Sequence, residues 1–557
     1  MSARLQGIAA APGVARAAPW IFRPPDTAAG GPRVPIAEAA RSAAAELERL
    51  AARLRDEGND EEAAIFDAQS LMAVDEELIG VAKEREAAGE DAVEAMLAAG
   101  EATAAVFEGL DDELLAARAA DVRDVAARIA RHVVGGSAPL LEQRSIVVAT
   151  DLAPSVTVEL DRALLAGIAL EGGSRTSHAA ILARALGIPA VVSVPELIER
   201  AMAAGSLAID GASGLVVLDP DEAAVVELDR AAAADEEAQA ADEAFRDRPL
   251  ATADGHRVAC YANIGEPAEA APAFAAGAEG IGLFRTEFAF AGRSTAPTED
   301  EQAAAYEQVL RAAGEAEVIV RLADIGGDKP LPYLPIATEA NPFLGVRAIR
   351  LATLHPDLFA TQARAVLRAS ARAGRPASIM APMVADAADV DYVRELVAAA
   401  RAEVPDAPAP RVGIMVEILS AALLAEQLAP MVDFMSIGTN DLTQYLLAVD
   451  RTNPALAERQ DAVHPAVLRA IARVVEGAHA SPEGCEVAVC GEMAGDPQAA
   501  VLLVGLGVDE LSMGAGSMGA VKRAVAARTR DEMAAIARQA LGLRSAAEVR
   551  ALLGGDA

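Results

Sequence analysis

The sequence has few of the residues that mark several whole classes of protein. Only three of its 557 residues are cysteine, and Cys260, Cys485 and Cys490 have neither the number for a disulfide framework nor the spacing of a zinc site. No run of about 18 apolar residues occurs, so we expect no direct insertion into a membrane. These absences predict a cytoplasmic protein in a reducing compartment.

Positive charge is also scarce. Lys and Arg number 48 against 83 Asp and Glu, which gives a net charge of −35. A phosphate backbone needs surfaces rich in Lys and Arg, so we expect no nucleic-acid partner. The acidity is explained most simply by a solvated surface, and it also permits a basic protein partner. Because 53% of the residues are hydrophobic, a sizeable core is expected and disorder is not.

The texture of the chain divides it into several parts. Residues 1–22 begin with a strand-like segment, and residues 23–137 are rich in Ala, Glu, Arg and Leu. Apolar residues from Ile36 to Leu54 recur at spacings of three and four, which predicts an amphipathic helix in a helical bundle. Short apolar runs alternate with helical pieces over 138–222, so this region completes a small α/β domain with 1–22. Residues 223–250 contain an Ala- and Glu-rich stretch that predicts a helical linker.

Residues 251–557 contain eight short apolar runs separated by helical segments. Eight strands with intervening helices predict a (β/α)₈ barrel of the TIM type, whose chemistry lies at the carboxyl ends of its strands. The fold class is therefore α/β and multidomain, with a helical bundle inserted in an α/β domain. The strands are expected to begin near Val258, Gly280, Val318, Ser378, Val412, Asp433, Glu486 and Asp509.

His178 has a setting unlike that of the other five histidines. It follows the segment Gly172-Gly173-Ser174-Arg175-Thr176-Ser177, in which Thr176 or Ser177 can cap the helix that begins near His178. The N–H groups of a helix N-terminus stabilise a phosphoryl group, and neutral imidazole is a competent nucleophile. We interpret His178 as a nucleophile that carries a phosphoryl group. The alternative is a histidine that merely ends a loop.

Arginines follow several of the expected barrel strands. Arg285 and Arg321 stand at strand ends, and Arg347 lies in a Gly-rich segment. Surface salt bridges would explain each arginine alone. Guanidinium groups match phosphate and carboxylate oxygens, so three in such settings predict an anion pocket.

Two carboxylates and a thiol follow other strands. Glu417 and Asp441 stand at strand ends and offer the oxygen ligands that Mg²⁺ prefers. A core-edge carboxylate and a helix cap are the alternatives for these two residues. Cys490 ends the seventh strand, where its thiol is either a proton donor or a small buried apolar group.

These motifs together resemble enzyme I of the bacterial sugar phosphotransferase system, the family of phosphoenolpyruvate–protein phosphotransferases. The segment around His178 also resembles the phosphohistidine domain of pyruvate phosphate dikinase and phosphoenolpyruvate synthase. The resemblance covers nearly the whole chain. It departs from the family pattern at Ser174, an extra residue between Gly173 and Arg175, and at Ile418-Leu419, where the family commonly has Thr-Pro.

The resemblance implies a role for each motif residue. His178 is the phosphohistidine, oriented by Thr176, and Cys490 protonates the enolate as pyruvate forms. The substrate phosphoenolpyruvate contacts Arg285, Arg321, Arg347, Asn440, Asp441 and Arg451, and Mg²⁺ is bound by Glu417 and Asp441. It implies that residues 23–137 bind the phosphocarrier protein HPr, that 251–557 form a homodimer, and that the reaction begins sugar uptake.

Two rival functions remain. A dikinase or phosphoenolpyruvate synthase would use ATP and would need a nucleotide-binding domain before the histidine, where this chain has Ala- and Glu-rich helices. A regulatory protein could keep the architecture and signal by its phosphorylation state. It predicts impaired chemistry, but every matched reactive side chain is present.

Overall fold

In the computed structural model of the chain, the contacts divide it into two units, Met1–Glu236 and Glu237–Ala557. No helix among the described residues is long and apolar enough to cross a membrane. The residues that the structure describes are 3–22, 33–56, 60–108, 113–135, 141, 143–152, 156, 160–173, 178–185, 187–290, 293, 295–327, 331, 333–334, 336–337, 339–451, 453, 456, 459–482 and 484–554.

The first unit contains an eight-stranded sheet in the order β1-β8-β7-β3-β4-β5-β6-β2. Its centre, from β3 to β6, is parallel, and the flanking pairs are antiparallel. The strands expected after residue 138 are present, and β8 is a further strand that was not predicted. Residues 1–22 form three strands where one strand-like segment was expected. The strands are β1 (Ala3–Gln6), β2 (Ile8–Ala11), β3 (Val14–Ile21), β4 (Ser145–Ala149), β5 (Leu165–Leu170), β6 (Ala190–Val192), β7 (Leu207–Asp210) and β8 (Leu215–Leu218).

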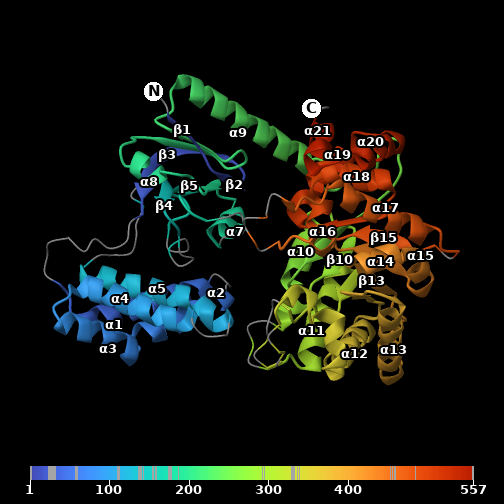
Figure 1. The fold of residues 1–557 in the computed structure, drawn as a ribbon, viewed down its shortest axis with the longest axis horizontal. Helices are drawn as coiled ribbons and strands as arrows, with labels where there is room; N and C mark the ends of the chain where they lie inside the picture. The colour runs from blue at the N-terminus through green and yellow to red at the C-terminus, as the bar shows by residue number, and fades with distance from the viewer. Residues whose placement is uncertain are drawn as a thin grey trace. The chain divides into compact units, whose positions relative to one another are not determined.

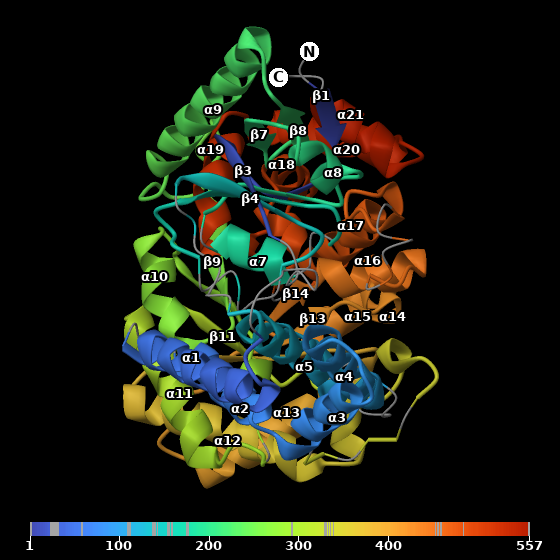
Figure 2. The same cartoon turned by 90° about the vertical axis from the view of Figure 1, so that its left-hand side faces the viewer.

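Both faces of this sheet are covered. Successive residues of β4 alternate between two apolar clusters, with Val147 in one and Ile146 and Val148 in the other. Helix α7 (His178–Ala185) packs on the first face through Ala179, Ala180 and Ala183, and α8 (Leu197–Ala201) packs on the second (Figure 2). Strands buried on both faces are hydrophobic throughout, as β4 and β5 are.

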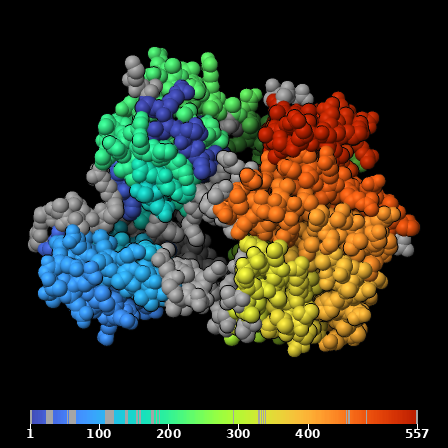
Figure 3. Space-filling view, in the orientation of Figure 1, coloured from blue at the N-terminus to red at the C-terminus, as the bar shows by residue number. Residues whose placement is uncertain are grey.

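Five helices of the first unit form the bundle, drawn in blue in Figure 3. Asp75 caps the third of them, because its carboxylate accepts hydrogen bonds from the N–H groups of Glu77 and Leu78. Their apolar faces meet in one core that includes Ile36, Leu47 and Ile129. The helices are α1 (Ile36–Asp56), α2 (Asp60–Ala73), α3 (Glu76–Ala87), α4 (Ala92–Glu108) and α5 (Glu113–Val133).

A buried ion cluster joins α1 to α5. Glu46 accepts hydrogen bonds from Arg128 at 2.5 Å and Arg131 at 2.7 Å, and its other oxygen lies 2.6 Å from Nε2 of His132. Burial alone would raise the pKa of Glu46, but the contact with His132 and the two guanidinium charges outweigh it and lower that pKa to about 2. The charged form of Glu46 therefore stabilises the bundle.

The helical linker is shorter than the sequence indicated. Helix α9 (Glu222–Glu243) begins where expected, but it ends several residues before Arg248. After Glu243 the backbone turns through hydrogen bonds of the i to i+3 kind, from Phe245 to Asp242 and from Arg246 to Glu243. The carbonyl oxygen of Arg246 then accepts a hydrogen bond from the buried ammonium group of Lys522 at 2.6 Å, which fixes the turn.

The second unit is a closed barrel of eight parallel strands, so the predicted barrel is confirmed (Figure 1). Each strand begins within one residue of its expected position. Along the strands, Ile319 and Met380 belong to one apolar cluster, while their neighbours Val320 and Ile379 belong to the larger core that contains the helices. The strands are β9 (Ala259–Ile264), β10 (Gly280–Phe284), β11 (Val318–Arg321), β12 (Ser378–Ala381), β13 (Val412–Val416), β14 (Phe434–Ile437), β15 (Glu486–Val489) and β16 (Glu510–Met513).

Helices follow the barrel strands in sequence. Thr298 begins the first long one with a capping box, and Gly374 ends the next in a left-handed conformation with φ of 70°. The helices are α10 (Ala270–Ala275), α11 (Glu299–Ala313), α12 (Pro356–Ala373), α13 (Ala387–Glu403), α14 (Leu419–Leu423), α15 (Ala425–Leu428), α16 (Thr439–Leu447), α17 (Pro465–His479), α18 (Pro497–Leu506), α19 (Met518–Ala526), α20 (Arg530–Gly542) and α21 (Ala546–Gly554).

The ion cluster of the bundle predicts an acid-sensitive stability. The folded pKa of Glu46 lies below that of the unfolded chain, so its contribution is complete above about pH 4.5 and is lost as the pH falls toward 2. Glu46→Gln should cost the bundle about 3 kcal/mol at neutral pH, at 1.36 kcal/mol per pKa unit. Hydrogen exchange in α1 and α5 measures this cost, corrected at each pH for intrinsic exchange. The exposed Glu48→Gln on the same helix is the control, and equal protection in both variants at pH 7 would contradict the prediction.

Candidate functional site

The carboxyl ends of the barrel strands bring most of the expected residues to one face. Arg285 follows β10, Arg321 ends β11, Glu417 follows β13 and Cys490 follows β15. Asn440 and Asp441 lie in the first turn of α16, and Arg451 lies beyond its end. The strands of a closed parallel barrel all end at the same face, so residues far apart in sequence converge there.

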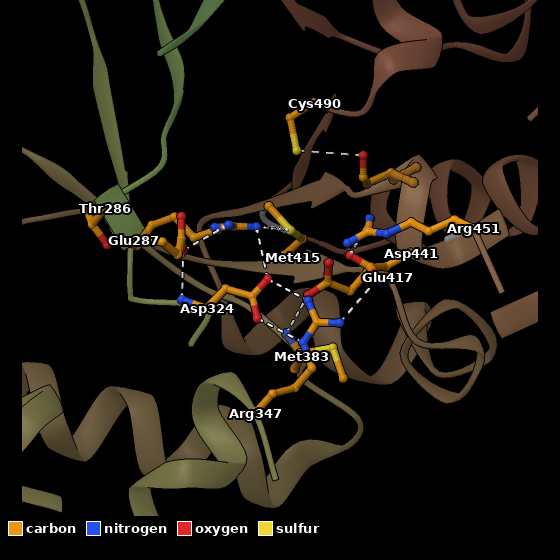
Figure 4. A network of polar contacts seen from close by, with 12 residues as sticks. Thr286, Glu287, Asp324, Arg347, Met383, Met415, Glu417, Asp441, Arg451 and Cys490 are labelled. Atoms are coloured by element: carbon orange, nitrogen blue, oxygen red, sulfur yellow. Dashed lines mark hydrogen bonds and ion pairs between the residues drawn. The ribbon is translucent and has the colours of Figure 1, made fainter. Parts of the chain in front are cut away.

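Arg347 and Asp324 form the most buried ion pair of this face. Arg347 is only 1% exposed, and it donates to both oxygens of Asp324, from Nη2 at 2.7 Å and from Nε at 3.0 Å (Figure 4). Its Nη1 also lies 3.4 Å from the Asp441 carboxylate. Burial disfavours the charge of Arg347, but the carboxylates of Asp324 and Asp441 more than offset this and raise its pKa.

Arg321 forms ion pairs with two carboxylates, those of Glu287 and Asp324. Its Nη2 lies 2.9 Å from Oε1 of Glu287, and its Nη1 lies 3.5 Å from Asp324. Burial opposes its charge, but these carboxylates prevail and raise the pKa of Arg321. Glu287 also accepts a hydrogen bond from the backbone N–H of Asp324 at 2.7 Å, so the ends of β10 and β11 are tied together.

A buried glutamine strengthens the same tie. Gln362, on α12, accepts a hydrogen bond from the N–H of Ala323 and donates one to the hydroxyl of Thr286, each at 2.9 Å. Thr286 in turn donates to the carbonyl oxygen of Arg321 at 2.9 Å. Gln362 is fully buried. These bonds fix Arg285 and Arg321 relative to each other through their neighbours.

Glu417 and Asp441 form a compact carboxylate pair. Glu417 is 1% exposed, and it accepts a hydrogen bond from the N–H of Met383 at 2.6 Å. Burial and the charge of Asp441 together raise the pKa of Glu417. Asp441 lies 3.6 Å from Arg451 and 3.4 Å from Arg347. Two buried carboxylates offer the donor atoms of a hard cation, although the described residues contain no cluster of three or more potential protein ligands.

Cys490 lies beside an open hollow at the same face. Its side chain is 2% exposed, and burial raises the pKa of its thiol to about 11, so the thiol keeps its proton at neutral pH. The hollow has a volume of about 450 Å³, and Asn263, Arg285, Gly491 and Met513 line part of it. Arg285 forms no ion pair with another described side chain, and Glu492 and Asp496 also line this hollow.

His178 and Thr176 are the two predicted site residues outside the barrel. His178 is the first residue of α7, as the motif indicated, and its side chain is not among the described ones. Thr176 and the inserted Ser174 lie outside the described residues, and so does Ser177. The first residue of α7 nevertheless stands where backbone N–H groups are free of partners within the helix.

Several residues of this face were missed by the sequence reasoning as site members. Glu287 lies two residues after Arg285 in the sequence, and Asp324 lies three residues after Arg321. A signal existed for both, because a buried arginine needs a carboxylate nearby. Asn263 and Gln362 carried a weaker signal, since a polar residue in an apolar segment has many explanations.

The fold and the face define a class of protein. Arginines and carboxylates at the carboxyl ends of a closed parallel barrel are typical of an enzyme that acts on a small anionic substrate. Three family descriptions match successive stretches: "PEP-utilising enzyme, N-terminal" over residues 6–118, "mobile domain" over 141–214 and "PEP-binding domain" over 239–530.

Individual proteins match over the whole length. The phosphoenolpyruvate-protein phosphotransferase of Geobacillus stearothermophilus is 41% identical over 98% of this chain and 96% of its own. That of Staphylococcus carnosus (strain TM300) is 38% identical over 99% and 98%. A solution structure of the Enzyme I protein nEIt is 32% identical, covers 42% of this chain and 99% of its own, and has a TM-score of 0.35. The chain belongs to the phosphoenolpyruvate-protein phosphotransferase family of PEP-utilising enzymes, and the resemblance found in its motifs is confirmed.

From the buried ion pair of Arg347 and Asp324, we expect a loss of barrel stability in Arg347→Met that can be measured without substrate. Arg347→Met should destabilise the barrel by about 3 kcal/mol, because it leaves Asp324 buried without its bidentate partner. The double variant Asp324→Asn/Arg347→Met should recover part of this loss. Hydrogen exchange in β11 and the adjoining residues 348–353 measures both effects. A double variant less stable than the single one would contradict the prediction.

Proposed function

We propose that the chain moves the phosphoryl group of phosphoenolpyruvate onto His178 and then to a histidine of the phosphocarrier protein HPr, with release of pyruvate. One observation carries the proposal: guanidinium groups, two buried carboxylates and a protonated thiol meet at the barrel mouth. A phosphorylated enol needs these three kinds of group, for its phosphate, its metal ion and its methylene carbon.

The arginines of the barrel mouth have different proposed roles in binding the substrate. Arg285, Arg321 and Arg451 contact the phosphoryl oxygens, supported by Asn440 and Asp441. Arg285 is the cation most open to a ligand, because it has no ion pair with a described side chain and it lines the hollow. Arg347 is a further substrate contact, and it also orients Asp441, to which it donates. Fixed charges of this kind stabilise a phosphoryl transition state without having to reorganise.

Glu417 and Asp441 would hold the Mg²⁺ ion. Their fit rests on two buried carboxylates, since burial and then the like charge of Asp441 raise the pKa of Glu417. A bound divalent cation would supply positive charge that neutralises the phosphoryl oxygens. Ile418 and Leu419 replace the usual family residues after Glu417, but they leave its carboxylate buried beside Gly438.

The chemistry balances with the groups at hand. A nitrogen of neutral His178 forms a bond to phosphorus as the bond from phosphorus to the bridging oxygen breaks. The departing enolate takes a proton from the Cys490 thiol at its methylene carbon, which becomes the methyl group of pyruvate. The electron pair of the S–H bond stays on sulfur, and solvent later returns the proton. The thiol is protonated beforehand because burial raises its pKa to about 11.

The rest of the chain serves the second transfer. His178 must meet the barrel mouth and then the carrier, so we infer a hinge near the linker of residues 223–250. Residues 1–22 with 138–222 carry the histidine, 23–137 bind HPr, and 251–557 bind phosphoenolpyruvate and form a homodimer. The acidic chain suits a carrier with a basic docking face. This assignment places the enzyme in the cytoplasm at the first step of sugar uptake.

The half-reaction has a direct test. Intact-mass analysis after addition of phosphoenolpyruvate and Mg²⁺ should find one acid-labile phosphoryl group on the wild type and none on His178→Ala. His132→Ala, in the helical bundle, is the matched control and should still be phosphorylated. Addition of HPr should then remove the group from the wild type.

Two results would favour the rival functions. A folded wild type that gains no phosphoryl group would contradict the proposal and favour a regulatory protein. If the purified protein uses ATP to phosphorylate pyruvate, with no phosphoenolpyruvate added, the result would favour a dikinase or synthase.

A further inference from the structure

Asn263 lies near the end of β9, and its side chain reaches past the neighbouring strand β16 to Cys490, which follows β15. Its Nδ2 donates to the carbonyl oxygen of Cys490 at 2.9 Å and to that of Ser512 at 3.2 Å. Its Oδ1 accepts from the hydroxyl of Ser512 at 2.7 Å. A carbonyl oxygen only accepts, so the two carbonyl groups fix which end of the amide is nitrogen. The Asn263 side chain therefore has one orientation.

The segment Cys490–Glu492 is also held from its other side. The N–H of Glu492 donates to Oδ1 of Asn440 at 3.1 Å. Gly491 lies against Thr439, so closely that a Cβ on Gly491 would collide with the Thr439 side chain. The segment is thus clamped between Asn263 on β9 and the first turn of α16.

The Cys490 side chain is packed in the apolar cluster inside the barrel, and its polar contacts are few. The thiol makes a long contact of 3.8 Å to the carbonyl oxygen of Ile437 and interacts with the side chain of Ser436 (Figure 4). The direction of the S–H group also depends on the backbone of Cys490, and Asn263 binds the carbonyl group of that residue. Asn263 also shares the wall of the hollow with Arg285, so it joins the proton donor to the proposed phosphate site.

We propose that Asn263 is a positioning residue that aims the Cys490 thiol at one face of the enolate, with Ser512 fixing the amide. The inference rests on the proposed role of Cys490 as proton donor. It adds a geometric requirement. The proton is delivered to one face of the enolate because the hydrogen bond from Asn263 holds the carbonyl group of Cys490 in place. A small displacement of a reacting group costs as much as about 10²-fold in rate.

Asn263→Asp is the sharpest variant, because it keeps the shape and replaces the donor with a carboxylate. That carboxylate faces two carbonyl oxygens, which repel it and push the segment away. Turnover should fall about 10-fold to 100-fold while the KM for phosphoenolpyruvate changes little. Asn263→Ala removes the hydrogen bond to the Cys490 carbonyl, and Ser512→Ala removes the hydrogen bond that orients the Asn263 amide, both without adding charge. They keep the inference testable if Asn263→Asp folds poorly.

The face of protonation gives a readout that general loss of stability would not change. Phosphoenolpyruvate with one deuterium of known geometry on its methylene carbon reacts in tritiated water, and the configuration of the resulting methyl group is measured. A held acid gives one configuration, whereas an enol that leaves the site is protonated by water on both faces. We expect one configuration from the wild type and a mixture from Asn263→Asp, Asn263→Ala and, less completely, Ser512→Ala.

Lowering the pH should restore protonation on one face in the Asn263→Asp variant. The carboxyl group introduced by Asn263→Asp is placed beside carbonyl oxygens, which raises its pKa. Once protonated it donates to the Cys490 carbonyl, so a single configuration should return as the pH falls from about 8 toward about 6. Asn263→Ala has no such group and should stay mixed at every pH.

Two controls separate this inference from the proposed function. Ser378→Ala removes a buried barrel hydroxyl that donates to Glu317, at the start of β12, and should keep one configuration. Cys490→Ala should give a mixture. If Cys490→Ala keeps one configuration, the role of Cys490 fails. If Cys490→Ala is mixed while all the Asn263 variants keep one configuration, the inference about Asn263 alone is overturned.

Discussion

Burying charge is the constraint on which this barrel mouth depends. Removing a guanidinium or carboxylate group from water costs several kcal/mol, and the cost is offset only when opposite charges meet with good geometry. Arg347 meets Asp324 through two hydrogen bonds, and Arg321 meets Glu287. These pairs fix the positions of the guanidinium and carboxylate groups at the mouth. Arg285 has no such partner among the described side chains, in line with its proposed role as a contact of the substrate.

The position of these pairs follows from the barrel. Parallel strands place their carboxyl ends at one face of the barrel. They do not fix how far each strand end extends along the barrel axis or in which direction its side chains point. Buried hydrogen bonds supply that setting: Gln362 and Thr286 join β10 to β11, and Asn263 joins β9 to the end of β15. Each is a neutral amide or hydroxyl group with its bonds satisfied, so each adds rigidity without adding charge to a crowded site.

The sequence was informative where chemistry and local pattern coincide. Arg321 and Glu417 end or follow short apolar strands, and that pattern alone placed them at the barrel face. The partnership of Arg347 with Asp324 could not be predicted, because the two residues are 23 positions apart and neither lies in a predicted strand or helix that would bring them together. Asn263 is 227 positions from Cys490, and only closure of the barrel makes them neighbours. Strand β8 was missed because four residues after a turn carry too weak a signal. The turn that follows α9 includes a contact with Lys522, a residue too distant in sequence for its pairing to be predicted.

The balance of charge explains why substrate and metal should depend on each other. Among the residues proposed to bind the substrate or the metal and their ion-pair partners, four guanidinium groups (Arg285, Arg321, Arg347 and Arg451) are matched by four carboxyl groups (Glu287, Asp324, Glu417 and Asp441). With all eight groups ionised, this set has no formal net charge. Phosphoenolpyruvate brings about three negative charges at neutral pH, from one carboxylate and a nearly fully ionised phosphate. Either the substrate or a divalent cation alone would leave a large uncompensated charge in a buried site, whereas both together leave about one. In the proposed reaction, each ligand would therefore lower the electrostatic cost of binding the other.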